Sequence, residues 1–230
     1  MNIENNIKLW SSLGMRATFG LIAMELAKKN PDLMITTSDV STSAGLDRYK
    51  NKYPEKFIDV GIAEQNLIGI SAGLSSEGFK VISTTFSPFQ TLRCCEQIKV
   101  NLGYMKKNVK MIGLASGLAL GSLGFTHASI EEIGVIRSIP NITIISPADV
   151  RETIKSLEAA LNHHQSVYIR LTGGSNNSLI YDFNDLSFDE SLHQLKIEAE
   201  DAVGNLTKLE LKFYRKSEKT HNTKNIIESN

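Results

Sequence analysis

Residues 57–67 read Phe57-Ile58-Asp59-Val60-Gly61-Ile62-Ala63-Glu64-Gln65-Asn66-Leu67, and in this stretch a short apolar run meets the start of a helical pattern. Downstream, Leu67, Ile70 and Leu74 recur at the spacing of one helix face, so Glu64 is expected in the first helical turn. The helix dipole favours a carboxylate at that position. Taken alone, Glu64 could therefore be a solvated residue that stabilises the helix, or a group that takes part in chemistry.

The composition is that of an ordinary globular protein. The chain has 230 residues with 25 basic and 25 acidic side chains, so its formal net charge is zero. A balanced charge gives no support for nucleic acid or an anionic membrane as the main partner. No run of about 18 apolar residues occurs, and the polar N-terminus lacks the layout of a secretion signal. Cys94 and Cys95 are adjacent, so they can form neither a disulfide bridge that stabilises the fold nor a metal site with spaced ligands. Such cysteines are typical of a reducing compartment, and we therefore expect a cytoplasmic protein.

Short apolar strands alternate with helical patterns along most of the chain. Besides the run at residue 57, strands are expected at residues 33–36, 80–84, 109–114, 142–145 and 167–170. This alternation predicts an α/β fold, a mostly parallel sheet with helices on both faces. A ligand is then expected beyond the carboxyl ends of the strands.

The helix starts carry recognisable signals. Helices are expected at residues 16–29, from Glu64 to about 78, from 87 to about 102, after residue 129, and from 149 to about 163. Ser87 is expected as an N-cap, followed by Pro88 at the first helical position. Ser129 and Glu132 have the spacing of a capping box.

The composition changes at residues 173–177, which read Gly-Gly-Ser-Asn-Asn. We therefore expect a first domain over residues 1–173 and a short polar extension over residues 174–230. A strand is expected at Thr207–Phe213, and the last dozen residues are expected to be disordered.

Loops that follow the expected strands would bring several side chains to one edge of the sheet. These candidates are Asp39, Glu64, Phe86, Phe89, His127 and Arg170. Several of them have a purely structural alternative. The two phenylalanines could be core residues, and Asp39 could be a turn residue. His127 could simply form a hydrogen bond within its own loop. Arg16 and Arg170 could hold a phosphate or pair with carboxylates. The chain has no P-loop and no Gly-Asp-Gly motif, so it shows no site of its own for a nucleotide or a magnesium diphosphate.

Four ordered motifs together resemble the pyrimidine-binding domain of transketolases. They are residues 59–66, 85–89, 124–127 and 137–149, within a resemblance that covers about Leu13 to Thr172. The likeness is closest to the small C-terminal subunit of split transketolases. The same domain type occurs in deoxyxylulose phosphate synthases and in the β subunits of 2-oxo acid dehydrogenases.

The resemblance implies that half of a thiamine diphosphate site lies here, in a thiamine diphosphate-binding fold of the pyrimidine type. Glu64 would hydrogen-bond N1′ of the aminopyrimidine and control its tautomer. Phe86 and Phe89 would stack on the pyrimidine, and Asp39 would lie near the cofactor. The diphosphate and its Mg²⁺ would be held by a separate N-terminal subunit, so a hetero-oligomer is implied, with no metal ligands in this chain.

The resemblance also implies a substrate and a reaction. His127 would contact substrate oxygens, and Arg16 and Arg170 would bind a sugar phosphate. The enzyme would transfer a two-carbon ketol unit between sugar phosphates. The extension after residue 173 is too short for the third domain that normally follows in transketolases.

Some residues depart from the family pattern. Leu123 and Phe125 stand where transketolases usually carry an Asp and a Pro. Ala115 replaces a second substrate histidine, and Leu92 replaces a third aromatic residue. These changes put the discrimination among sugar hydroxyls in question. Two alternatives therefore stay open: an acyloin-forming or decarboxylating thiamine enzyme of specialised sugar biosynthesis, and a non-catalytic remnant that binds its partner.

Overall fold

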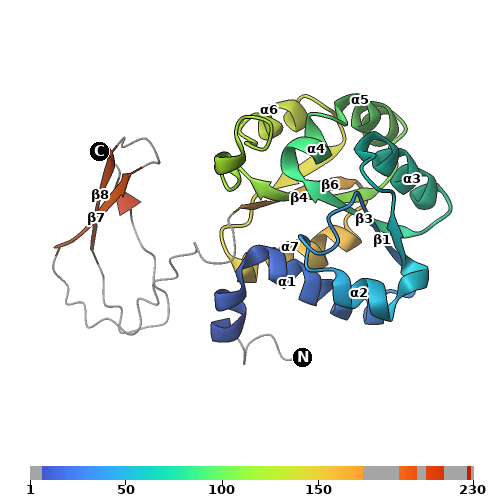
Figure 1. The fold of residues 1–230 in the computed structure, drawn as a ribbon, viewed down its shortest axis with the longest axis horizontal. Coiled ribbons are helices and arrows are strands. Elements are labelled where there is room, and N and C mark those ends of the chain that lie inside the picture. Colours follow the sequence, from blue (N-terminus) through green and yellow to red (C-terminus); the bar gives the residue numbers. More distant parts are fainter. Residues whose placement is uncertain (1–6, 173–191, 201–205, 215–226, 229–230) are drawn as a thin grey trace. The chain divides into compact units, whose positions relative to one another are not determined.

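The computed structural model describes residues 7–172, 192–200, 206–214 and 227–228, in two compact units, Met1–Leu179 and Ile180–Asn230 (Figure 1). The first unit contains a six-stranded sheet in the order β2-β1-β3-β4-β6-β5, and every strand pair is parallel. Its strands are β1 (Leu33–Thr37), β2 (Phe57–Asp59), β3 (Lys80–Phe86), β4 (Val109–Ser116), β5 (Ile142–Ile145) and β6 (Ser166–Thr172). All of these strands were expected, and the predicted fold class is confirmed.

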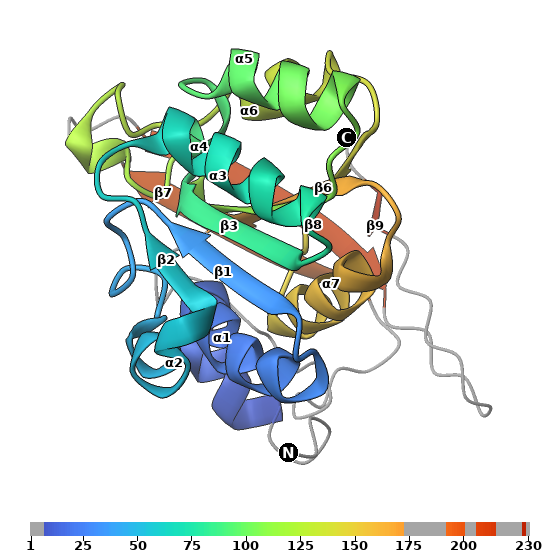
Figure 2. The ribbon, with the colours of Figure 1, turned by 90° about the vertical axis from the view of Figure 1, so that its right-hand side faces the viewer.

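Helices cover both faces of this sheet (Figure 2). One face carries α1 (Ile7–Lys29), α2 (Asp47–Lys52) and α7 (Val150–Asn162). The other carries α3 (Glu64–Ser76), α4 (Ser87–Thr91), α5 (Cys95–Ile98) and α6 (Glu132–Arg137). Short helical turns η2 (Pro54–Lys56), η3 (Lys99–Tyr104) and η4 (Gly121–Leu123) complete the unit. Among the described residues, no helix is both long and apolar enough to cross a membrane.

Each face has its own hydrophobic core. Phe19 of α1, Tyr49 of α2 and Leu157 of α7 pack on one side of the sheet. Ile68 of α3 and Ile98 of α5 pack on the other side. Burial on both sides explains why the strand sequences are continuously apolar rather than alternating. The sheet is thereby fixed in place, and the loops at its carboxyl edge have a rigid support.

The expected continuous helix over residues 87–102 is wrong. Helix α4 ends at Thr91, a turn follows at residues 92–94, and α5 and the π-helical η3 come after it. At this turn Arg93 contacts the first two residues of α3, through its side chain and its carbonyl oxygen. Helical periodicity could not reveal these contacts because they join segments distant in the sequence.

Two of the expected caps are also wrong. Phe86 is the N-cap of α4, so Pro88 is at the second helical position, and the Ser87 hydroxyl bonds Ser116 Oγ at 2.5 Å instead. Helix α6 begins at Glu132 without a side-chain cap. The expected Asp149 start of α7 is confirmed, because its carboxylate accepts a hydrogen bond from the backbone of Glu152 at 2.7 Å.

The second unit contains an antiparallel sheet among its described residues. Strand β7 (Leu192–Glu200) pairs with β8 (Leu206–Tyr214), which pairs with β9 (Ile227–Glu228). The strand expected at Thr207–Phe213 is confirmed by β8. The expected domain boundary at residue 173 falls outside the described residues and stays a prediction. So does the expected disorder of the last dozen residues, which lie outside them apart from β9.

In the six-stranded sheet of the first unit, Lys110 lies near the amino-terminal end of β4. It is a buried cation without a carboxylate partner in the described part of the chain. It is 3% exposed. Its Nζ donates to the carbonyl oxygens of His163 at 2.8 Å and Gln165 at 2.7 Å, and to Asn108 Oδ1. Burial lowers the pKa of Lys110 to about 8. This side chain therefore joins β4 to the turn between α7 and β6.

Lys110 is expected to make stability depend on pH in the alkaline range. Its pKa is about 8 in the folded chain, against an ordinary value of 10.5, so the unfolded chain binds more protons between these values. The free energy of unfolding should therefore rise as the pH increases through this window, by up to about 3 kcal/mol. Urea unfolding at several pH values should show this rise in the wild type and its loss in Lys110→Met. An unchanged pH dependence in the variant would contradict the expectation.

Candidate functional site

The sheet has a switch point between β1 and β3. The chain leaves β1 toward β2 on one side, and it leaves β3 toward β4 on the other. In open α/β sheets, ligands bind beyond the carboxyl ends of the strands at such a point. The loops there carry Asp39 after β1, Glu64 after β2, and Phe86 at the end of β3. Three of the expected site residues are thus placed at one edge by the topology itself.

The start of α3 is tied to the loop after β1. Ala63 N donates to Ser38 Oγ at 3.1 Å, and Ser38 Oγ donates to the carbonyl oxygen of Gly61 at 2.5 Å. Asp59 Oδ1 accepts from the backbone N–H groups of Asp39 at 2.9 Å and Gly61 at 3.0 Å. Asp39 and Gly61 both have positive φ, 53° and 70°. Asp39 is therefore an exposed turn residue in the loop after β1, and its carboxylate makes no hydrogen bond with residues 14–172.

Glu64 is buried rather than solvated, so the solvated alternative is wrong. The residue is 5% exposed. Its Oε1 accepts from Arg93 Nη1 at 2.7 Å, and Oε2 accepts no hydrogen bond from residues 14–172. Gln65 Nε2 donates to the carbonyl oxygen of Arg93 at 3.1 Å. A buried carboxylate with one unengaged oxygen can accept a hydrogen bond from, or share a proton with, a ligand.

Three rings lie together near Arg93, the residue that contacts Glu64. Phe86 and Phe89 lie 6.2 Å apart between ring centroids, and His127 lies 5.2 Å from Phe89 and 6.4 Å from Phe86. The Arg93 guanidinium carbon is 4.0 Å from the Phe89 centroid. All three rings are partly buried, so neither phenylalanine is a fully enclosed core residue. Arg93 thus covers one face of Phe89, and the rings of His127 and Phe86 meet Phe89 in edge-on arrangements.

Cys94 follows Arg93 and is not a nucleophile in this setting. Its thiol donates to the carbonyl oxygen of Phe89 at 3.1 Å. Burial, with a smaller effect of the Glu64 charge, raises the pKa of Cys94 to about 12. The thiolate is the reactive form of cysteine, so Cys94 stays an unreactive thiol at neutral pH.

His127 lies near the end of a loop closed by a reciprocal pair of hydrogen bonds. Gly117 N donates to the carbonyl oxygen of Ser129, and Ser129 N donates to that of Gly117, both at 2.8 Å. These bonds, rather than a capping box, are the role of Ser129. His127 Nδ1 lies 3.0 Å from Thr126 Oγ1. Its own loop thus supports the imidazole, as one alternative proposed, while the ring faces the two phenylalanines.

The positions that depart from the family pattern have different surroundings. Leu123 and Phe125 project from the same loop and are 57% and 82% exposed. Ala115, at the end of β4, is buried and has φ 53°. Leu92 lies in the turn between α4 and α5 and is 38% exposed.

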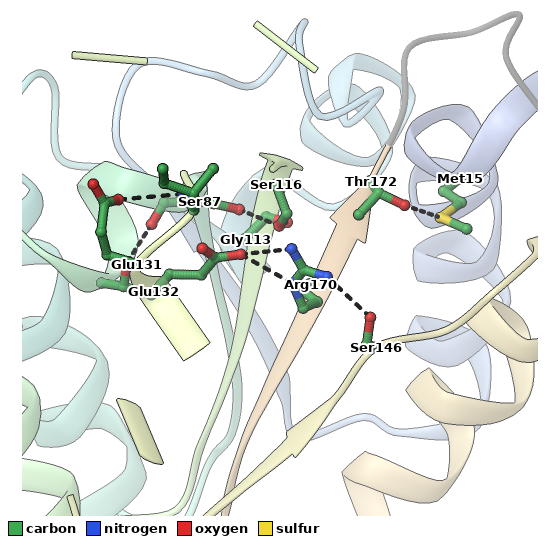
Figure 3. Close-up of polar contacts among 11 residues, drawn as sticks. Met15, Ser87, Gly113, Ser116, Glu131, Glu132, Ser146, Arg170 and Thr172 are labelled. Carbon is green, nitrogen blue, oxygen red and sulfur yellow. Dashed lines mark hydrogen bonds and ion pairs between the residues drawn. The ribbon is translucent and has the colours of Figure 1, made fainter. Parts of the chain in front are cut away.

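Arg170 is held by a buried carboxylate (Figure 3). Its Nε and Nη2 donate to Glu132 Oε1 at 2.9 and 2.8 Å, and its Nη1 lies 3.2 Å from Ser146 Oγ. The side chains of Arg170 and Glu132 are 15% and 1% exposed. The alternative that Arg170 pairs with a carboxylate is therefore correct, but this ion pair is buried rather than on the surface. Two of its five N–H donors are left for a ligand.

A buried polar cluster lies next to this ion pair (Figure 3). Ser87 Oγ bonds Ser116 Oγ at 2.5 Å, and Tyr168 presents its hydroxyl to the same place. A Cβ on Gly113 would lie 2.5 Å from the Tyr168 hydroxyl and 2.6 Å from Ser87 Oγ. Gly113 is therefore required for the strand to pack against this cluster. Burial raises the pKa of Tyr168 to about 12, so the phenol stays neutral.

Sequence reasoning missed Arg93, Asp59, Ser38 and Glu132. Asp59 and Ser38 flank expected loops. Asp and Ser side chains often form hydrogen bonds with backbone groups of nearby residues, so this signal could have identified them. Glu132 was assigned to a cap, and Arg93 was placed inside a helix that does not exist. Arg16 lies half-buried on α1, and its side chain makes no hydrogen bond or ion pair with residues 14–172. The described residues contain no cluster of His, Cys, Asp and Glu that could hold a metal ion.

Comparison with known proteins identifies the domain. Residues 11–176 match the family described as "Transketolase, pyrimidine binding domain". The chain belongs to this family. The match covers most of the chain and all of the site, which confirms the resemblance carried by the motifs around Glu64, Phe86 and His127.

Relatives of this transketolase pyrimidine-binding domain include chains of split enzymes. It is 36% identical over 176 residues to one subunit of the apulose-4-phosphate transketolase of Phocaeicola vulgatus, covering 76% of this chain and 56% of that one. It is 31% identical to a putative transketolase C-terminal section of Methanocaldococcus jannaschii, covering 82% and 60%. The chain thus spans little more than half the length of these relatives.

A solved structure supports the same grouping. A split-gene transketolase, described as an inactive beta4 tetramer, is similar with a TM-score of 0.64 and 32% sequence identity. The similarity covers 82% of this chain and 60% of that one.

Proposed function

We propose that this chain is the pyrimidine-binding subunit of a two-chain, thiamine diphosphate-dependent, transketolase-like enzyme. The enzyme would transfer a two-carbon ketol unit between sugar phosphates. The observation that carries the proposal is the buried Glu64 carboxylate at the start of α3, which has one unengaged oxygen and which Arg93 connects to the group of three rings. Membership of the transketolase family supports the type of reaction.

The residues at this edge fit one half of the cofactor. Glu64 Oε2 would share a proton with N1′ of the pyrimidine, accepting a hydrogen bond from N1′–H when the ring is in its imino tautomer, while Phe86 and Phe89 would hold the planar ring. Asp39 would lie at the border of this half-site. When bound, thiamine diphosphate supplies the carbon nucleophile for the transfer. The chain contributes a proton-sharing carboxylate and an orientation.

Substrate recognition is proposed for the cationic and imidazole groups near the site. His127 would donate to a substrate oxygen from the loop that Gly117 and Ser129 close. Arg170 would offer its two remaining N–H donors to a sugar phosphate, and its orientation would be fixed by Glu132. Arg16 would be a second phosphate ligand.

A partner chain is proposed for the diphosphate and Mg²⁺. Similar proteins are described as one subunit of a transketolase and as a C-terminal section, which supports a second chain. The inactive state of the solved beta4 tetramer supports it further. The exposed face of α3 suits the contact: an added Cβ at Gly69 or Gly73 would meet nothing within 4 Å, so another backbone could approach closely.

The isolated chain is expected neither to bind thiamine diphosphate tightly nor to catalyse transfer. Stacking and one hydrogen bond contribute only about 2 to 3 kcal/mol beyond area burial, which does not offset the cost of fixing a flexible cofactor. Calorimetric titration of cofactor with Mg²⁺ should show binding only after the diphosphate-binding chain is added. The partner chain alone is the control. Micromolar, magnesium-dependent binding by the lone chain would contradict the half-site.

The proposed function itself is tested by mixing the two chains with a ketose phosphate donor and an aldose phosphate acceptor. Formation of the two-carbon-extended product, dependent on both chains and on cofactor, is the expected result. Cofactor binding without any transfer would instead favour the non-catalytic alternative.

A further inference from the structure

Arg93 reaches the site because the helix after β3 is interrupted. The turn at residues 92–94 directs both its side chain and its carbonyl oxygen toward α3. There the guanidinium meets Glu64 and the carbonyl oxygen meets Gln65, at 2.7 and 3.1 Å. Two adjacent residues of α3 thus fix a single residue of this turn. A continuous helix could not place Arg93 in both contacts.

The contact between Arg93 and Glu64 is not an ordinary surface ion pair. The Glu64 side chain is 6% exposed, whereas that of Arg93 is 43% exposed. A buried carboxylate is costly unless it is paired and hydrogen-bonded. Among residues 14–172, whose side chains are described, Arg93 alone provides Glu64 with a hydrogen-bond donor from a side chain. Although Arg93 is partly exposed, it therefore provides the main compensation for burying the Glu64 carboxylate.

A second contact fixes the plane of the guanidinium. Its central carbon lies 4.0 Å from the centroid of Phe89, within the range of a cation–π interaction. The guanidinium of Arg93 thus contacts the Glu64 carboxylate and the Phe89 ring, and the backbone carbonyl oxygen of Arg93 accepts a hydrogen bond from Gln65. This arrangement assigns Oε1 of Glu64 to Arg93 and leaves Oε2 unengaged.

We propose that Arg93 is a positioning residue for the cofactor half-site. It holds Glu64 by Oε1 so that Oε2 is presented to the pyrimidine, and it covers one face of Phe89 so that the ring stacks on the other. This proposal rests on the proposed function. Arg93 itself need not touch the cofactor.

The contact is tested first without cofactor, by a double-mutant cycle in the lone chain. Arg93→Met is expected to lower Tm by about 5 °C, because it leaves the Glu64 carboxylate buried without its cation. In the Glu64→Gln background the same change should lower Tm by less than half as much. Arg151→Met is the matched control, since Arg151 is exposed on α7 and makes no ion pair with residues 14–172. Equal shifts in both Glu64 backgrounds would overturn the proposal.

The positioning role is tested next with the partner chain. Calorimetry should show at least about tenfold weaker cofactor binding by Arg93→Met, and intermediate binding by Arg93→Lys, which keeps the charge but not the planar fork. In the Glu64→Gln background, Arg93→Met should change the affinity by less than about threefold. Circular dichroism verifies that each variant is folded.

The outcomes separate this proposal from the function on which it rests. If the wild-type pair binds no cofactor, the proposed function is overturned, and this role of Arg93 falls with it. If the wild-type pair binds cofactor and Arg93→Met binds it equally well, the positioning role alone is overturned. Weakening that depends on Glu64 supports both.

Discussion

Glu64→Gln is expected to lower turnover of the two-chain enzyme by at least about a hundredfold. A neutral amide keeps the shape of the side chain, but it cannot share the N1′ proton as a carboxylate does. The fold should survive, because Arg93 is partly exposed and water can solvate its charge once Glu64 is neutral. Turnover at saturating cofactor is the quantity to measure, together with circular dichroism.

A matched control for this substitution is Glu96→Gln. Glu96 is exposed on α5 and makes no ion pair with residues 14–172, so its loss should leave turnover within about twofold of the wild type. A loss below about tenfold in Glu64→Gln would rule out the assigned role of this carboxylate.

Glu132→Ala is expected to lower the free energy of unfolding by about 3 to 5 kcal/mol. The substitution leaves the Arg170 guanidinium, only 15% exposed, without the oxygen that accepts two of its hydrogen bonds. Urea unfolding of the lone chain measures this loss directly. Glu132→Gln should cost less, since an amide oxygen can still accept from Arg170.

An exposed ion pair of the same chain provides the comparison. Glu158 Oε1 lies 3.5 Å from Lys29 Nζ, and these side chains are 37% and 67% exposed. Glu158→Ala should therefore cost less than about 1 kcal/mol. Similar losses in Glu132→Ala and Glu158→Ala would contradict the view that burial makes the Glu132–Arg170 pair important.

The sequence was sufficient for the fold because the fold depends on local patterns. Short strand runs, the helix opened by residues 146–149 and the helical spacing after Glu64 are short-range signals, and all appear in the structure. The junction at Glu64 could be located for the same reason. Its burial could not, because an exposed and a buried acidic residue look alike at a helix start.

The contacts around the site could not be predicted because they join distant segments. Arg93 meets Glu64 across 29 positions, and Arg170 meets Glu132 across 38. The sequence near Arg93 continues a helical pattern, so nothing local indicates the turn. Ser129 and Glu132 have the spacing of a capping box, yet each is engaged elsewhere, by Gly117 and by Arg170. Tertiary pairing overrides a local signal in each case.

The most direct test of the proposed half-site is a crystal structure of the two-chain complex with thiamine diphosphate and Mg²⁺. Glu64 Oε2 is predicted to lie within hydrogen-bond distance of N1′, roughly 2.6 to 3.2 Å, while Oε1 stays on Arg93. The pyrimidine is predicted to lie on the face of Phe89 that Arg93 leaves uncovered. A pyrimidine bound elsewhere, or N1′ paired with a residue other than Glu64, would contradict the half-site.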